Sequence, residues 1–453
     1  MLRNLAISLP RLVLVACLTA GLAFSAAAQS LIRDTEIEAI MRDYTDPLLV
    51  AADLRPEDVQ MFLINDPSLN AFVAHGQRVH LHTGLIIEAE TPGQLKGVIA
   101  HEIGHIAGGH LVRSDAAIAI AQRPALISIG LGVLAIAAGA GDAGAALIAS
   151  SQQFAMASFF THTRAQEASA DQAAVSYLTK TGQSTQGLVE FFENFRYQEV
   201  LSQARRFEYF RSHPLASDRI KSLRQRGQEA GHWDAVEDEL AVHQLKIVHA
   251  KLIGFLEPIV RVHQLYPLTD TSEPARYARA IASMQAADIS TALGEIDSLL
   301  TEFPNNPFYH ELKGQILFES GRAAESVAPH QRSIELLEDA PLLLINYARS
   351  VIARGEEGDL EKGENALRDA LIVEPGNAFA WQQLAIAYEK QGRRPEAELA
   401  TAEAAYYIGD RARAYVFAER AMRELDRFTP NGRRASDIAA ITDPRLEENR
   451  RYR

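Results

Sequence analysis

The stretch that decides the fold of this chain is TPGQLKGVIAHEIGHIAGGH, residues 91–110. It opens with the signals of a helix start. Thr91 can cap the helix, Pro92 suits the first helical position, and Gln94 can complete a capping box. Apolar residues then recur at helical spacing, which predicts a buried face, and a pair of glycines marks the end. The sequence therefore predicts one largely buried helix here.

This helix carries the pattern H-E-x-x-H at His101, Glu102 and His105. Residues four apart share one helix face, so the two imidazoles can converge on one ion, and zinc binds neutral imidazoles at about 2 Å. Glu102 lies about 100° around the helix from His101 and can take a proton from water at the metal. Burying a charged side chain such as Glu102 in an apolar helix costs free energy unless the charge has a partner. We therefore favour a metal site over a surface helix with coincidental histidines.

A third metal ligand must come from elsewhere in the chain, and His110 and Glu167 are the nearest candidates. We favour Glu167, because Asp171 follows it one helical turn later on the same face. A carboxylate in that position can accept the far N–H of a ligand histidine and fix its tautomer. The alternative for this acidic pair is an exposed helix face.

Residues 1–28 have the pattern of a secretory signal peptide. Arginines precede an apolar run from Leu12 to Phe24, and small residues before Gln29 offer a cleavage site. A lipobox-like sequence ends at Cys17, but the residues after it stay apolar up to Ala28, so we favour cleavage there over lipid attachment. Removal of the only cysteine leaves His, Asp and Glu to hold any metal.

Short strands are predicted before the central helix. Met61–Ile64 and Ala71–Ala74 are apolar runs, and Arg78–Thr83 alternates apolar and polar residues after a turn, which indicates a hairpin. An exposed edge such as Arg78–Thr83 could bind a substrate as an added strand.

An apolar insert at about 124–160 includes the run ALISIGLGVLAIAAGAG, residues 125–141. At about 17 residues this run is short for a membrane span, which needs about 20. Asp142 interrupts the apolar stretch, which continues to Ala149. We favour a buried or self-covering helix pair. The alternatives are a mobile helical flap beside the active site and a re-entrant or membrane-surface hairpin over 125–149.

The C-terminal half repeats. Ala287, Gly321, Gly355 and Gly392 occupy equivalent turn positions at separations of 34, 34 and 37 residues. This period is typical of tetratricopeptide repeats, which stack into an α-solenoid with a concave groove. A plain helical bundle is the alternative. We expect the solenoid over 272–425, after a linker at 236–271 and before a polar tail at 426–453.

Composition excludes one class of partner. The chain has 453 residues and a formal net charge of −13. This length predicts two or more domains. The acidic balance argues against nucleic-acid binding.

Four motifs together resemble a known family. They occur in the same order in the zinc metallopeptidases that include the CAAX prenyl protease: Asn70-Ala71-Phe72, the HEIGH helix, the Glu167/Asp171 pair, and Ser212-His213-Pro214 with Arg219-Ile220. A signal peptide followed by tetratricopeptide repeats is similar to the periplasmic β-barrel assembly-enhancing branch of that family. The motifs cover residues from about 31 to 235, and the repeats resemble the branch more loosely.

The resemblance implies a role for each motif residue. The ligands of one zinc ion per chain would be His101, His105 and Glu167. Glu102 would be the general base and Asp171 would support a ligand histidine. His213 would fill the fourth position on zinc in a resting state, as a latch. Arg219 would lie near the substrate carbonyl or a structural carboxylate.

These expectations define one fold and three hypotheses of function. The fold is mainly α, with a gluzincin-type metallopeptidase domain at 29–235 that holds a small β-hairpin sheet, followed by the solenoid. The first hypothesis is a periplasmic zinc endopeptidase that degrades misfolded or stalled outer-membrane β-barrel proteins and assists their assembly, with the repeats binding client or assembly machinery. The second is a non-proteolytic chaperone or scaffold with a structural metal, and the third an intramembrane protease.

Overall fold

The structure of the protein is a computed structural model. The structure describes residues 31–74, 76–110, 126–129, 131, 133, 163–201, 213 and 217–445. The predicted signal peptide with Cys17, and most of the apolar insert at 124–160, lie outside these ranges. Within them, no helix is long and apolar enough to cross a membrane.

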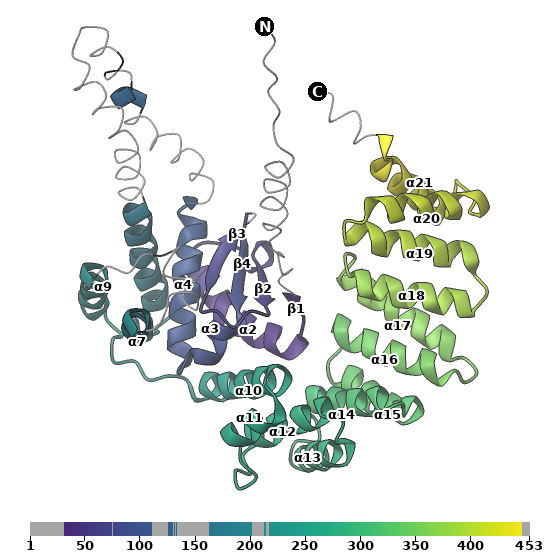
Figure 1. Cartoon of the computed structure of the whole chain (residues 1–453), viewed down its shortest axis with the longest axis horizontal. Coiled ribbons are helices and arrows are strands. Elements are labelled where there is room, and N and C mark those ends of the chain that lie inside the picture. Colours follow the sequence, from purple (N-terminus) through teal and green to yellow (C-terminus); the bar gives the residue numbers. More distant parts are fainter. Residues whose placement is uncertain are drawn as a thin grey trace, which may run out of the picture.

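The predicted mainly helical fold with a small sheet is confirmed (Figure 1). Four described strands form one sheet in the order β1-β2-β4-β3. They are β1 (Leu31–Ile32), β2 (Gln60–Ile64), β3 (Ala71–Ala74) and β4 (Arg78–His82). Strands β3 and β4 make the predicted antiparallel hairpin. Strand β2 pairs with β4 in parallel, which the sequence did not indicate.

The expectation that Arg78–Thr83 forms an exposed edge is wrong. Strand β4 lies between β2 and β3, so both of its sides are already hydrogen-bonded. The predicted hairpin pairs only one side of β4, with β3. The parallel pairing with β2 occupies the hydrogen-bonding groups on its other side. Among the described strands, β3 is the outer one at this end of the sheet.

Helix α4 (Pro92–Ala107) begins as the sequence predicts. The Thr91 side chain accepts the N–H of Gln94, and the Gln94 side chain in turn accepts the N–H of Glu90 at 2.9 Å. The apolar face of the helix is fully buried, at Leu95, Val98, Ile99 and Ile103. Helix α2 (Thr35–Ala51), the inner face of the sheet and α4 share this core, and α3 (Thr83–Glu88) joins it.

Two glycines allow other helices to lie directly against α4. A Cβ on Gly104 would stand 2.9 Å from the carbonyl oxygen of Ala170, in the helix at residues 163–180. A Cβ on Gly97 would stand 2.6 Å from a side-chain atom of α7 (Gln186–Leu201). The helix at 163–180 therefore approaches α4 at backbone contact beside the second histidine of the motif.

The expected linker at 236–271 is helical instead. It forms α10 (Glu239–Leu256) and α11 (Ile259–Leu265). Helix α10 buries Leu245, Val248 and Leu252 in the core of the N-terminal domain, and it also packs on α12, the first helix of the solenoid. These apolar residues recur at helical spacing and need a partner, so the segment joins the two parts through a continuous core.

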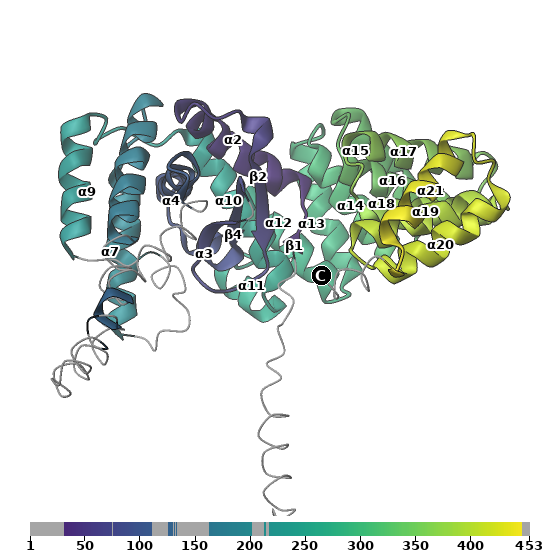
Figure 2. The same cartoon turned by 90° about the horizontal axis from the view of Figure 1, so that it is seen from above.

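The solenoid consists of antiparallel helix pairs stacked along one axis, seen from two sides in Figures 1 and 2. Its helices are α12 (Glu273–Gln285), α13 (Ile289–Glu302), α14 (Pro307–Glu319), α15 (Ala323–Leu336), α16 (Pro341–Arg354), α17 (Asp359–Val373), α18 (Ala378–Lys390), α19 (Arg394–Tyr407), α20 (Arg411–Glu424) and α21 (Pro430–Thr442). The predicted turn residues Ala287, Gly321, Gly355 and Gly392 all have positive φ, at 59°, 81°, 72° and 74°.

The expected polar tail at 426–453 is also corrected. Residues Pro430–Thr442 form α21, which buries Ala435, Ile438 and Ala439 against its neighbours. An alanine-rich stripe is small enough to pack closely on α20, so the helix covers the last apolar face of the stack. Residues 446–453 lie outside the described part.

A buried ion cluster joins the two parts. Lys251 on α10 lies 2.8 Å from Asp34 and 3.1 Å from Glu36 at the start of α2. The hydroxyl of Tyr277 on α12 donates to the same Glu36 oxygen at 2.8 Å. Burial alone would lower the pKa of Lys251, but the two carboxylates hold it above its usual range.

We expect Lys251→Met to destabilise this junction, because it leaves the buried Glu36 and the partly buried Asp34 without their counter-charge. Removal of one partner from a buried ion pair costs about 3–5 kcal/mol. Denaturant unfolding should show this loss, and adding Glu36→Gln should recover part of it. Lys246→Met on the exposed side of α10 is the matched control. Equal stability of the Lys251 and Lys246 variants would contradict the expected role of the cluster.

Candidate metal centre

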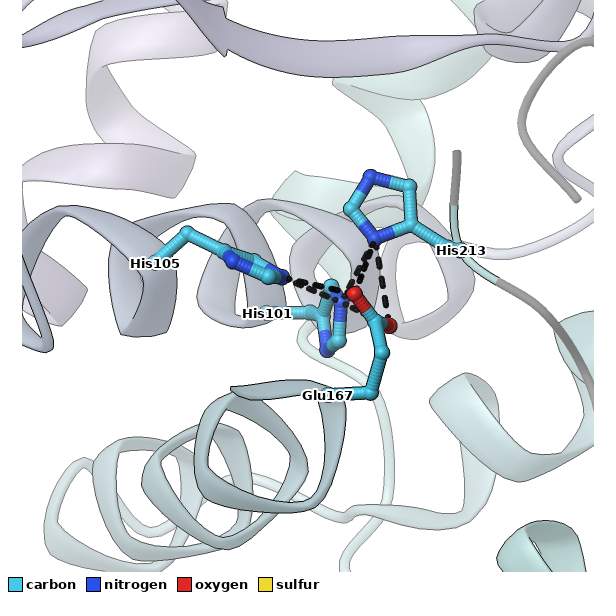
Figure 3. A group of neighbouring side chains, drawn as sticks. All are labelled: His101, His105, Glu167 and His213. Atoms are coloured by element: carbon cyan, nitrogen blue, oxygen red, sulfur yellow. Dashed lines mark hydrogen bonds and ion pairs between the residues drawn. The ribbon is translucent and has the colours of Figure 1, made fainter. Parts of the chain in front are cut away.

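Three chain segments bring four potential metal ligands together (Figure 3). His101 and His105 come from α4, Glu167 from the helix at 163–180, and His213 from just before α9 (Ser217–Ala230). One ligand atom from each lies within 4.8 Å of the others. His101, Glu167 and His213 are buried, and His105 is partly so.

The distances within this cluster fit a tetrahedral ion. Nε2 of His101 lies 3.1 Å from Nε2 of His105, 3.3 Å from Nδ1 of His213 and 3.4 Å from Glu167 Oε2. Nε2 of His105 lies 3.4 Å from Glu167 Oε1. Ligand atoms about 2 Å from a tetrahedral zinc are about 3.3 Å apart. The donor set of nitrogen and carboxylate oxygen is also one that zinc accepts, so these residues fit such an ion.

Behind His101 lies a second acidic residue. Nδ1 of His101 is 3.1 Å from Asp171 Oδ1, so Asp171 can hold the proton on that nitrogen and leave the Nε2 lone pair facing the cluster. Burial alone would lower the pKa of His101, but its contacts with Asp171 and Glu167 raise it to about 9.

Arg219 bridges both carboxylates. Its Nε and Nη2 donate to Asp171 at 2.6 and 2.7 Å, and its Nη1 lies 2.8 Å from Glu167. These bonds outweigh the desolvation of Asp171 and lower its pKa. The guanidinium therefore binds the carboxylates of Asp171 and Glu167. The family resemblance had placed Arg219 near either a structural carboxylate or the substrate carbonyl.

Glu102 is almost fully buried, with 1% of its surface exposed. Burial raises its pKa to about 7, against the opposing pull of His105 and His101. Its Oε1 has no hydrogen-bond partner among the described residues, and the Nε2 of His213 lies 3.5 Å from it. A carboxylate with this pKa and position can exchange a proton near neutral pH.

His213 contacts both the ligand carboxylate and the candidate base. Its Nδ1 lies 3.1 and 3.2 Å from the two oxygens of Glu167, while its Nε2 faces Glu102. Figure 3 shows the Nδ1 side of the ring directed at the cluster and the other nitrogen directed away from Glu167. The neighbours Ser212 and Pro214 lie outside the described residues.

His110, the alternative third ligand, is not in the cluster. It lies on the other side of His105, where the two Nδ1 atoms are 3.0 Å apart. Sequence reasoning also missed Phe192 on α7, whose ring lies 5.0 Å from the Arg219 guanidinium carbon and packs edge-on to His101. An apolar Phe-Phe pair in a helix looks like ordinary core, so the sequence carried no signal for this contact.

The arrangement supports a metallopeptidase. Residues 32–227 match the model of Peptidase family M48, which confirms the family resemblance drawn from the motifs.

Particular relatives extend the match to the repeats. The chain is 24% identical over 382 residues to the putative beta-barrel assembly-enhancing protease of Vibrio cholerae serotype O1, covering 79% of this chain and 75% of that protein. It is 26% identical over 360 residues to the beta-barrel assembly-enhancing protease of Escherichia coli strain K12, covering 77% and 71%. A crystal structure of MamA is weakly similar, with a TM-score of 0.30 and 15% identity over 38% of this chain and 97% of that one.

We expect Asp171→Asn to weaken metal binding by about 10–100-fold, because a neutral amide oxygen lacks the charge with which the carboxylate holds the His101 proton. Competition with a chromogenic chelator measures this change. Asp218→Asn, on an exposed position of α9, is the control and should bind metal like the wild type. Unchanged affinity in the Asp171 variant would show that its contact with His101 does not support the site.

Proposed function

We propose that this protein is a zinc-dependent endopeptidase of the bacterial envelope that acts on polypeptides, among them misfolded or stalled outer-membrane β-barrel proteins. The observation that carries the proposal is the convergence of His101, His105, Glu167 and His213 beside a buried Glu102. A purely structural metal site has no need of that carboxylate. The family match and the similarity to two beta-barrel assembly-enhancing proteases support the same activity.

In this proposal His101, His105 and Glu167 hold one zinc ion per chain. Zinc bound there supplies a Lewis acid and lowers the pKa of water. Asp171 and Arg219 act through the ligands. Asp171 fixes the tautomer of His101, and Arg219 balances the charge of the two acidic residues. We therefore assign Arg219 a positioning role, without direct contact with the substrate.

Glu102 acts as general base and then as general acid. Its buried carboxylate accepts a proton from the attacking water and delivers it to the leaving amine of the peptide. Burial raises the pKa of this carboxyl above its ordinary value, which helps the group to hold the proton between the two steps. Strand β3 (Ala71–Ala74), the outer described strand beside β4, is an edge that can receive an extended substrate by strand addition.

His213 is the latch of a resting state. Its contacts with Glu167 and Glu102 put the ring where both the fourth ligand position and the base are obstructed. A substrate must move the ring aside before water can reach Glu102. The enzyme would therefore cleave slowly until a client or partner displaces His213.

The solenoid supplies client or partner recognition in this proposal. Stacked helix pairs present a long concave surface, and α10 ties this surface to the core of the peptidase domain. We place the protein in the periplasm, since residues 1–28 have the pattern of a secretory signal.

We expect Glu102→Gln to lower casein cleavage by about 10²–10⁴-fold, because the amide cannot transfer a proton from water to the leaving amine. The zinc content should stay near one ion per chain. Metal analysis and cleavage are measured on the same preparation. A wild type that binds no zinc after gentle purification, or a Glu102 variant that cleaves normally, would refute the proposed activity and favour the scaffold hypothesis.

We expect His213→Ala to raise cleavage of casein above the wild-type rate, because it removes the ring from the cluster. The comparison uses initial rates at equal zinc loading. His232→Ala, at an exposed position outside the site, should leave the rate unchanged. A decrease in the His213 variant would show that the imidazole assists catalysis and does not act as a latch.

A further inference from the structure

The two glycines after α4 return the chain onto the second histidine of the motif. The helix ends at Ala107, and Gly109 adopts a left-handed conformation with φ of 61°. His110 then turns back, so that its ring lies edge-on to His105 with 4.9 Å between the ring centroids. His110 is buried, with 8% of its surface exposed.

Gly108 provides the space for this ring. A Cβ at Gly108 would stand 2.4 Å from Nε2 of His110 and 2.8 Å from its Cε1, closer than side chains tolerate. The glycine pair thus has a specific consequence beyond ending the helix. One glycine supplies the left-handed turn and the other leaves room for an imidazole against His105.

The contact involves the nitrogen of His105 that faces away from the cluster. Nε2 of His105 is directed at Glu167 and His101, whereas its Nδ1 lies 3.0 Å from Nδ1 of His110. A neutral imidazole that binds a metal through Nε2 carries its proton on Nδ1. That proton needs an acceptor, and the Nδ1 lone pair of His110 is at hydrogen-bond distance.

We propose that His110 is a positioning residue for the metal centre. It accepts the Nδ1–H of His105 and so keeps the Nε2 lone pair of His105 directed at the ion. His110 thus holds the proton of His105 as Asp171 holds the proton of His101. This role rests on the proposed zinc-binding function of the cluster. A neutral acceptor suits this side of the site, because Glu102, Glu167 and Asp171 are already buried around it.

The test separates an acceptor from a space-filling side chain. His110→Leu retains bulk but accepts no hydrogen bond, whereas His110→Asn places an amide oxygen near the position of Nδ1. We expect the leucine variant to bind zinc about 10–100-fold more weakly than the wild type, as for loss of other outer partners of ligand histidines. The asparagine variant should recover most of that loss.

Two measurements are made on each variant. Competition with a chromogenic chelator gives the zinc affinity, and nitrogen-15 spectra of histidine-labelled, metal-free protein report the His105 tautomer. The share of the Nδ1–H form of His105 should be similar in the wild type and the asparagine variant, and smaller in the leucine variant. Equal affinity and tautomer in all three proteins would overturn the proposal, as would equal losses in both variants. Absence of zinc binding in the wild type would instead overturn the proposed function.

Discussion

The close approach of the helix at 163–180 to α4 is the constraint on which the site depends. His101 and His105 share one helix and need no tertiary structure to face the same way. Glu167 lies on another helix, and its carboxylate can reach the same point only if the two backbones nearly touch. Gly104 permits this, because any side chain there would meet the Ala170 carbonyl. The spacer position between the two histidines therefore has a structural requirement of its own.

That approach brings several acidic groups into one buried volume, and the rest of the site offsets their charge. Burial alone would raise the pKa of Glu167, but its contacts with His101, His105 and His213 lower it instead. Arg219 contributes a permanent positive charge between Glu167 and Asp171. Glu102 lacks such a partner, and burial raises its pKa to about 7. In the proposed function, these different surroundings suit Glu102 to proton transfer, Glu167 to binding the ion and Asp171 to holding His101.

The sequence predicted the features that depend on local spacing. The start of α4 at Thr91 and the β3–β4 hairpin each follow from a few neighbouring residues. The turn positions at Gly321, Gly355 and Gly392 follow from the repeat period, and the structure adds that all three have positive φ. Predictions about features that depend on partners distant in sequence were either wrong or not made. The parallel pairing of β2 with β4 and the packing of α10 on both parts require tertiary contacts that a local pattern does not contain. For His110 the sequence showed an imidazole near the site, but its direction depends on the turn at Gly108 and Gly109.

The connection through α10 bears on how the two parts can act together. A flexible linker would let the solenoid capture a client without any effect on the peptidase domain. Here α10 shares a core with α2 and α4, packs on α12, and carries Lys251 into the ion cluster at the start of α2. A change in the first solenoid helices therefore has to be accommodated by the same core that holds α4 and its histidines. Because packed cores deform little, binding on the solenoid can favour one arrangement of the site over another. In the proposed function, a partner bound to the solenoid could act on the His213 latch through this shared core, without touching the latch itself.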